Sequence, residues 1–235
     1  MKRRIPLILT AVVLASLAPG FAFGQDATGD DLTVEELYLQ NVEIGIIREQ
    51  AVTTSRDSKL LALDNLQELV DEGKVDQDSV EALYLLDYLA MEGVDRVIRM
   101  NGRVINYFPM VRKQACNILG QIGGDTSKDI LLDSLSDEVE PMVMAEAAYA
   151  LGEVGLDENG EVSRALAFQL ISQNVTAPDD NFAFAVMLAY EKLAAANNGI
   201  REPSVYLSPI QAAEGNYIKP VRDKALQVMD SLRDY

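Results

Sequence analysis

The side chains that most often carry out enzymatic chemistry are scarce in this chain of 235 residues. It contains no histidine, no tryptophan and a single cysteine, Cys116. The absence of histidine excludes the usual serine–histidine–aspartate and cysteine–histidine sites, as well as the commonest zinc-ligand sets. Cys116 lies in an apolar stretch between Ala115 and Ile118, where a thiol usually serves as a core residue. We therefore expect no catalytic residues, no metal site and no cofactor.

Carboxylates are abundant, with 37 Asp and Glu residues. Two of them could act as the acid and base of a glycosidase, but no pair is marked out by its surroundings in the sequence. The acidic segment 157–161 (Asp-Glu-Asn-Gly-Glu) lacks the regular ligand spacing and the distal glutamate of a calcium loop. We expect it to form a turn between helices, and the other carboxylates to cover solvated helix faces.

The strongest pattern in the sequence is an internal repeat. Residues 109–123 read Pro-Met-Val-Arg-Lys-Gln-Ala-Cys-Asn-Ile-Leu-Gly-Gln-Ile-Gly, and residues 141–155 read Pro-Met-Val-Met-Ala-Glu-Ala-Ala-Tyr-Ala-Leu-Gly-Glu-Val-Gly. In two weaker copies, Val221 and Ala185 stand at the position of the valine that the close copies share (Val111 and Val143). A still weaker copy contains Ala62 and Leu66. The uneven spacing of the copies indicates insertions between units.

Each copy has the pattern of a helix with one buried stripe. Proline fits the first turn, where its missing N–H is not needed. The β-branched residue, the alanine four positions later and the leucine four positions after that share one face. The alanine lets helix axes approach closely, and the following glycine relieves crowding near the helix end. These structural positions are Val111, Arg112, Ala115, Leu119, Gly120, Val143, Ala147, Leu151, Gly152, Val221, Arg222 and Ala225.

The rest of the chain has helical spacing with short polar turns. Helices are predicted to begin at Thr33, to cover Ser58–Val70 and Ser79–Met91, and to be capped by Ser208 with Pro209 in the first turn. No sheet is predicted, because the strand-like piece Arg103–Tyr107 is explained equally well as a helix end and a loop. Between residues 79 and 108 the sequence pattern does not define where one repeat ends and the next begins. Since stacked helix pairs can bury the faces that single pairs expose, we predict an all-α solenoid of about four to five pairs over residues 32–235.

The repeated residues resemble the HEAT repeat, in particular the short variant first recognised in phycobilisome lyases, with its V-R-x-x-A-x-x-x-L-G-x-I-G helix. The match is close over Val111–Gly123 and Val143–Gly155, and partial over Val221–Leu232. The resemblance implies that these helices line the concave side and that the arginine pairs with an acidic residue of a neighbouring turn. Arg112 and Arg222 match that position, whereas Met144 departs from it, so a continuous arginine–carboxylate ladder is not expected.

The first 24 residues have the pattern of a cleavable signal peptide. A basic start is followed by the apolar run Ile5–Ala18 and by small residues before Gln25. An uncleaved N-terminal anchor is the alternative, and a lipid anchor is not expected because no cysteine stands at the cleavage site. Residues 25–31 are expected to be a flexible lead-in. This pattern predicts a periplasmic or secreted protein that is not inserted in the membrane after cleavage.

The chain is strongly acidic, with a net charge of −17. Removal of residues 1–24 would leave 17 Lys and Arg against 37 Asp and Glu, a net charge of −20. Such a surface repels a phosphate backbone, so we expect no nucleic-acid partner. In one interpretation this negative charge only keeps the protein soluble. In the other it attracts a basic partner.

The repeat phase leaves a row of side chains outside the buried stripe, and these are the candidate partner-binding residues. They are Gln114, Asn117, Glu146, Tyr149, Leu188, Glu191, Lys224 and Gln227. The mixture suits a protein or peptide, with Tyr149 as the best candidate for an energetic centre. In the alternative interpretation Tyr149 leans onto the next helix. The segment Asn197–Lys219 is either a connection packed by its own tyrosines or a binding loop.

Three functions are compatible with these observations. The favoured one is a non-catalytic interaction scaffold that binds its partner through the concave helix face. The second is a lyase-like protein or small-molecule chaperone, suggested by the family resemblance. The third is a structural envelope component that associates end to end.

Overall fold

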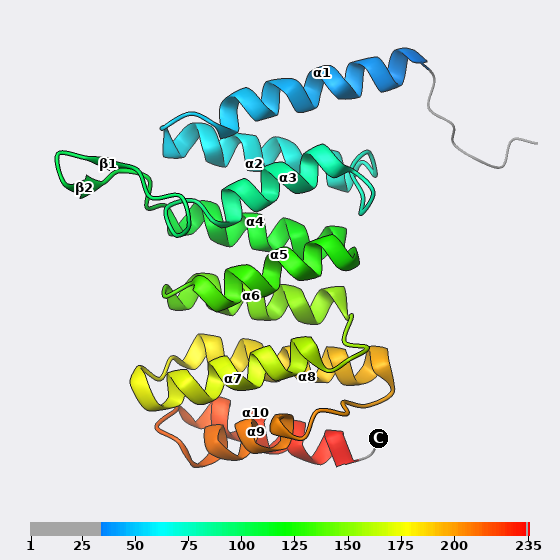
Figure 1. Ribbon diagram of the computed structural model, residues 1–235. Helices are drawn as coiled ribbons and strands as arrows, with labels where there is room; N and C mark the ends of the chain where they lie inside the picture. Colours follow the sequence, from blue (N-terminus) through cyan, green and yellow to red (C-terminus); the bar gives the residue numbers. More distant parts are fainter. Residues whose placement is uncertain (1–33, 234) are drawn as a thin grey trace, which may run out of the picture.

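The computed structural model describes the backbone of residues 34–233 and 235, and the side chains of residues 39, 42–233 and 235. The expected signal peptide (1–24), the lead-in (25–31) and the predicted helix start at Thr33 lie outside the described residues. The part that is described forms one column of helices from which a small hairpin projects (Figure 1).

The helices are short and are mostly joined by short turns. They are α1 (Val34–Ala51), α2 (Arg56–Asp71), α3 (Val80–Ala90), α4 (Pro109–Ile122), α5 (Gly124–Asp137), α6 (Pro141–Val154), α7 (Glu161–Thr176), α8 (Asp180–Asn197), α9 (Ser204–Glu214) and α10 (Lys219–Arg233). The strands β1 (Arg99–Met100) and β2 (Arg103–Val104) lie in the connection between α3 and α4.

The helices form five consecutive pairs, from α1–α2 to α9–α10, and the pairs stack along the column. Each even-numbered helix packs on the next, so that α2, α4, α6, α8 and α10 make one layer. The odd-numbered helices make the other layer. This arrangement confirms the predicted all-α solenoid of four to five helix pairs.

The predicted stripe of the repeat helices forms the core between the two layers. Val111, Ala115 and Leu119 are fully buried, and so are their counterparts Val143, Ala147 and Leu151. Val221 and Ala225 of the last helix are buried as well. The glycine after the leucine has the expected role. A Cβ atom added to Gly120 would lie 2.8 Å from the Cβ of Ala150, and one added to Gly152 would lie 2.7 Å from the Cα of Ala189.

Arg112 forms the ion pair that the family resemblance implied. Its fully buried guanidinium places Nε 2.6 Å from Oε2 of Glu138, in the turn between α5 and α6, and donates a hydrogen bond to the backbone oxygen of Glu92. The matching Arg222 is exposed and has no ion pair with any residue that the structure describes. Met144 is buried at the same position of α6, so the ladder is interrupted as expected.

The prediction that the chain contains no sheet was wrong for the connection between α3 and α4. There, Asn101 and Gly102 adopt positive φ angles of 51° and 79° and form the two-residue turn of a β-hairpin. The strands are only two residues long and both of their faces are exposed. An alternating apolar pattern, which requires one buried face, is therefore absent from the sequence.

The predicted start of the ninth helix was also wrong. The helix begins at Ser204, and Pro209 lies inside it. Glu202 supplies the N-terminal partner instead, since its Oε1 accepts hydrogen bonds from the backbone N–H and the hydroxyl of Ser204. Ser208 is buried, and its Oγ lies 2.8 Å from Oη of Tyr190. The segment therefore packs as the outer helix of the last pair.

Residues 157–160 of the acidic segment form the predicted turn between α6 and α7, and Glu161 begins α7. The buried Asp157 uses Oδ1 to accept hydrogen bonds from the N–H groups of Val162 and Ser163, at 3.0 and 3.2 Å. This carboxylate satisfies donors in the first turn of α7, which accounts for its presence in the sequence.

Candidate functional site

The predicted partner-binding residues all lie in the even-numbered layer. Gln114 and Asn117 are on α4, Glu146 and Tyr149 on α6, Leu188 and Glu191 on α8, and Lys224 and Gln227 on α10. The fold thus brings residues from four repeats onto one layer, as the repeat phase predicted. Their role in binding stays a prediction.

Most of the polar residues in this row link one even-numbered helix to the next. Nε2 of Gln114 donates to Oδ1 of Asp64 at 2.7 Å. Nδ2 of Asn117 donates to Oε1 of Glu146, also at 2.7 Å, and Nζ of Lys224 lies 2.6 Å from Oε2 of Glu191. These side chains therefore hold neighbouring repeats together as well as facing solvent.

Tyr149 leans onto the next helix of the layer. Its ring packs against the core, and Nζ of Lys192 on α8 lies 3.8 Å from the ring centroid. Lys192 also pairs with Glu153, and that hydrogen bond lowers the pKa of the Glu153 carboxyl. The half-buried tyrosine is thus anchored to the next helix, as in the alternative interpretation of its position.

A groove with a volume of about 620 Å³ opens between α6, α8 and α10. Its apolar lining includes Met142 and Tyr149 of α6, Phe184 and Leu188 of α8, and Ile218 at the start of α10. Two smaller hollows of about 240 and 400 Å³ continue the depression between α4 and α6. The predicted residues that line these spaces are Gln114, Asn117, Glu146, Tyr149 and Leu188.

The exposed apolar side chains of this surface form a row that our sequence interpretation missed. Met110, Met142 and Phe184 each directly precede the repeat valine or its counterpart, and they are 50%, 37% and 36% exposed. Ile218, beside the start of α10, is 54% exposed. The sequence contained a sign of this row, because Met110 and Met142 occupy the same position in the two closest repeat copies. Methionine and aromatic side chains are enriched in protein interfaces.

Paired charges surround the apolar floor of the groove. Oδ1 of Asp180 accepts the backbone N–H of Ile218 at 2.9 Å, and thereby ties the start of α8 to the start of α10. Nζ of Lys113 lies 3.7 Å from Oε2 of Glu146. Since these charges already have partners, the apolar side chains are the groups that gain most from contact with another molecule.

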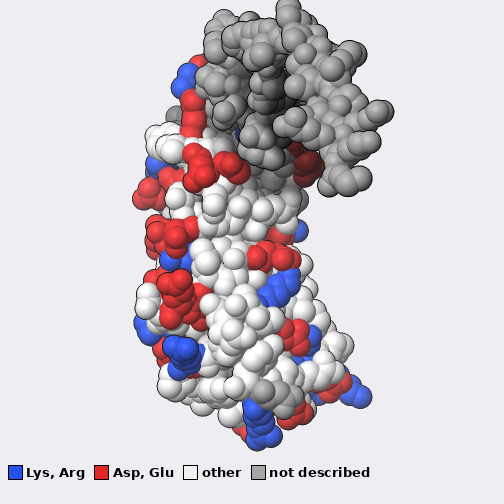
Figure 2. All heavy atoms as spheres, turned by 90° about the vertical axis from the view of Figure 1, so that its right-hand side faces the viewer, with Lys and Arg blue, Asp and Glu red and all other residues white. Residues whose placement is uncertain are grey.

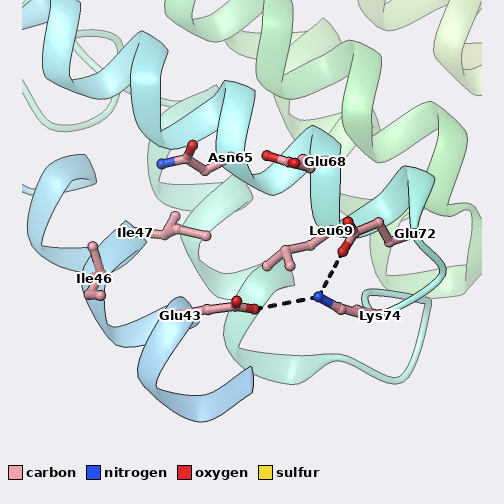
Figure 3. A pocket seen from close by; sticks show the side chains of 8 residues that line it. All are labelled: Glu43, Ile46, Ile47, Asn65, Glu68, Leu69, Glu72 and Lys74. Carbon is pink, nitrogen blue, oxygen red and sulfur yellow. Dashed lines mark ion pairs between the residues drawn. The ribbon is translucent and has the colours of Figure 1, made fainter. Parts of the chain in front are cut away.

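A separate hollow of about 270 Å³ lies between α1 and α2 and is shown in Figure 3. Glu43 and Glu72 approach Lys74 there, with Oε2–Nζ distances of 3.8 and 2.7 Å. The hydrogen bond with Glu72 is the main cause that raises the pKa of Lys74. This hollow is smaller than the groove and is lined by more charged groups.

The remaining reactive group, the thiol of Cys116, is placed for packing. It is fully buried, and its Sγ lies 3.4 Å from Oγ of Ser134. Burial raises the pKa of the thiol to about 12. Since the thiolate is the reactive form, this cysteine is inert in the folded protein.

The described part of the chain holds neither a cluster of metal ligands nor a membrane-spanning helix. No group of three or more His, Cys, Asp or Glu side chains within it could hold a metal ion. No helix among the described residues is long and apolar enough to cross a membrane.

Comparison with known proteins identifies the repeat. Residues 105–180, which extend from the end of the hairpin to the start of α8, match the family model described as HEAT repeats. No curated protein matches the chain. The matched segment contains both close copies of the sequence repeat, and the helix pairs on either side stack onto it in the same two layers. Residues 105–180 of this chain are therefore similar to HEAT repeats.

Proposed function

We propose that this protein is a non-catalytic interaction scaffold that binds a protein or peptide segment in the groove between α6, α8 and α10. HEAT-repeat solenoids in general present extended surfaces for binding other proteins. The observation that carries the proposal is the row of exposed apolar side chains at Met142, Phe184 and Ile218 beside that groove.

The chemistry of the groove indicates what kind of segment would occupy it. Its floor is apolar, and the charges beside it are already paired, so the expected anchors are aliphatic or aromatic side chains. The net charge of −17 favours a partner whose surroundings are neutral or basic, and it disfavours nucleic acid. The segment that occupies the groove is therefore apolar and has no excess of acidic residues.

The proposal includes a location in the periplasm or outside the cell, after removal of residues 1–24. The basic start, apolar run and small residues of that segment support it. Protein purified from the native host should begin at Gln25 when its N-terminus is sequenced. Retention of Met1 on a membrane-bound form would contradict this location.

Site-specific photocrosslinking tests the groove. A photoreactive phenylalanine analogue replaces Phe184 in one protein and Phe168 in another. Phe168 is a matched control because it is 68% exposed but lies on α7, in the other layer. Irradiation in the native envelope should give a discrete adduct from position 184 that is absent from position 168. Equal adducts from both positions, or none from position 184, would refute the proposed site.

A further inference from the structure

The hairpin between α3 and α4 projects away from the column, on the side where the even-numbered helices begin (Figure 1). Its two strands pair with each other through Arg99–Val104 and Met100–Arg103, and all four of these residues are exposed. The segment therefore adds little to the packing of the solenoid, and its conformation needs another explanation.

The composition of the hairpin differs from that of the rest of the chain. Residues 96–104 read Arg-Val-Ile-Arg-Met-Asn-Gly-Arg-Val, with three of the 20 basic residues and none of the 37 acidic ones. Apolar side chains between 36% and 60% exposed alternate with the arginines, namely Val97, Ile98, Met100 and Val104. A basic and apolar element thus projects from an acidic protein.

Two of the arginines are available for a partner. The guanidinium groups of Arg99 and Arg103 make no ion pair or hydrogen bond with any group in the described part of the chain. The guanidinium of Arg96 packs over the ring of Tyr88 at 5.0 Å. By contrast, Lys192 and Lys224 in the even-numbered layer are both paired with carboxylates.

The base of the hairpin is built to hold a fixed conformation. The buried side chain of Asn106 accepts the N–H of Ile98 at 2.8 Å and donates to the backbone oxygen of Arg96 at 2.5 Å. Gly93, with φ of 77°, packs so closely against the backbone of Asn106 that any side chain would clash. A preformed element loses little conformational entropy when it binds, so this rigidity favours recognition.

We infer that residues 96–104 form a second docking element, which binds a short acidic segment of a partner protein. Arg99 and Arg103 pair with carboxylates of that segment, since guanidinium groups match carboxylates in geometry and charge. Val97, Ile98, Met100 and Val104 contact its apolar side chains. The two arginines are the specificity determinants.

The charge of the column favours a short segment over an extended polyanion. Acidic side chains are spread along the side of the column that faces away from the hairpin (Figure 2), and the whole chain carries −17. An anionic membrane, a nucleic acid or a second copy of the chain carries many negative charges, and the net charge of the whole chain repels it. A short segment carries few charges and responds mainly to nearby groups, because charges farther apart than the screening length of about 8 Å at physiological ionic strength interact weakly.

Selection from a displayed library of random 12-residue peptides tests this inference on the full chain. We expect enriched peptides that combine Asp or Glu with apolar residues. Their affinity should fall about 10-fold or more in the Arg99→Ser/Arg103→Ser variant, a loss of two charge-assisted contacts. The matched control is Arg201→Ser/Arg222→Ser, which removes two exposed arginines elsewhere and should leave the affinity unchanged.

Three outcomes would overturn the inference. They are the absence of enriched peptides, equal affinity for the wild type and the Arg99→Ser/Arg103→Ser variant, and equal losses in both double variants. Flotation with phosphatidylglycerol vesicles that depends on Arg99 and Arg103 would assign the hairpin to a membrane instead. Binding at the hairpin is independent of the groove, so Phe184→Ala should leave peptide affinity unchanged even if the groove proposal fails.

Discussion

Lys59 and Arg112 occupy equivalent positions in two repeats, and each forms a buried ion pair with the turn of the following helix pair. Each lies three residues before the central alanine of its helix, Ala62 or Ala115. Nζ of Lys59 is 3.1 Å from Oε2 of Glu92, as Nε of Arg112 is 2.6 Å from Oε2 of Glu138. Because Arg112 also donates to the backbone oxygen of Glu92, the two pairs form one connected network across the first three helix pairs.

Removal of Arg112 should be strongly destabilising. Arg112→Ala leaves the Glu138 carboxylate buried without its cation, which typically costs about 3–5 kcal/mol in the free energy of unfolding. Arg222→Ala changes the same repeat position where the side chain is exposed, and it should alter stability by less than about 0.5 kcal/mol. Urea denaturation of both variants measures the difference. Equal losses would show that the network does not stabilise the fold.

The close approach of α6 and α8 depends on Gly152. In Gly152→Ala the added Cβ would lie 2.7 Å from the Cα of Ala189, so the helices must move apart, at a cost of about 1–3 kcal/mol. Gly45, in helix α1, has no atom within 4 Å of an added Cβ. Gly45→Ala should therefore raise the free energy of unfolding by up to about 1 kcal/mol. A stabilising effect of Gly152→Ala would disprove the close packing.

Cys116 should resist alkylation as long as the protein is folded. Burial raises the pKa of its thiol to about 12, so the thiol stays neutral at pH 8.5. Burial also keeps the reagent from reaching the sulfur atom. A folded-state pKa above the unfolded value near 8.5 adds stability below that pH, and this contribution is lost as the pH rises toward 12. Iodoacetamide should modify an exposed cysteine at Ser136→Cys within minutes, but Cys116 only after denaturant is added. Rapid modification of Cys116 in the native state would contradict the assignment.

Tyr149→Ala should lower the melting temperature. The ring packs against the core and under Nζ of Lys192, so its removal costs about 1–3 kcal/mol through lost burial and the lost cation–π contact. Phe168→Ala, on the exposed side of α7, is the control and should have little effect. If Tyr149→Ala melts like the wild type, the tyrosine is free for binding, as the repeat phase first suggested.

The sequence was sufficient for the architecture because one physical pattern occurs in several copies. Val111, Ala115, Leu119 and Gly120 each have a counterpart in α6, and every one of them is buried where the repeat places it. Lys59 was missed because its copy of the repeat is weak, and a lone lysine on an apolar stripe looks like a solvated residue until Glu92 is brought beside it.

The candidate site was only partly predictable. Repeat phase places residues on a layer, but it does not say which of them pair with a neighbouring helix. Asn117 donates a hydrogen bond to Glu146 in the next repeat. This contact forms only because α4 and α6 lie at a suitable distance, which the sequence does not reveal. The hairpin was missed for another reason, since its base is held by Asn106 and Gly93, two residues without a periodic signal.

The most direct test of the account is the affinity of the partner captured through position 184, measured by titration calorimetry. Met142→Ala/Phe184→Ala should raise Kd about 10-fold or more, since it removes two apolar anchors from the groove, while Phe168→Ala should leave Kd unchanged. Circular dichroism melts of the same samples establish that each variant is folded. If the folded groove variant binds with the wild-type Kd, the groove between α6, α8 and α10 is not the binding site.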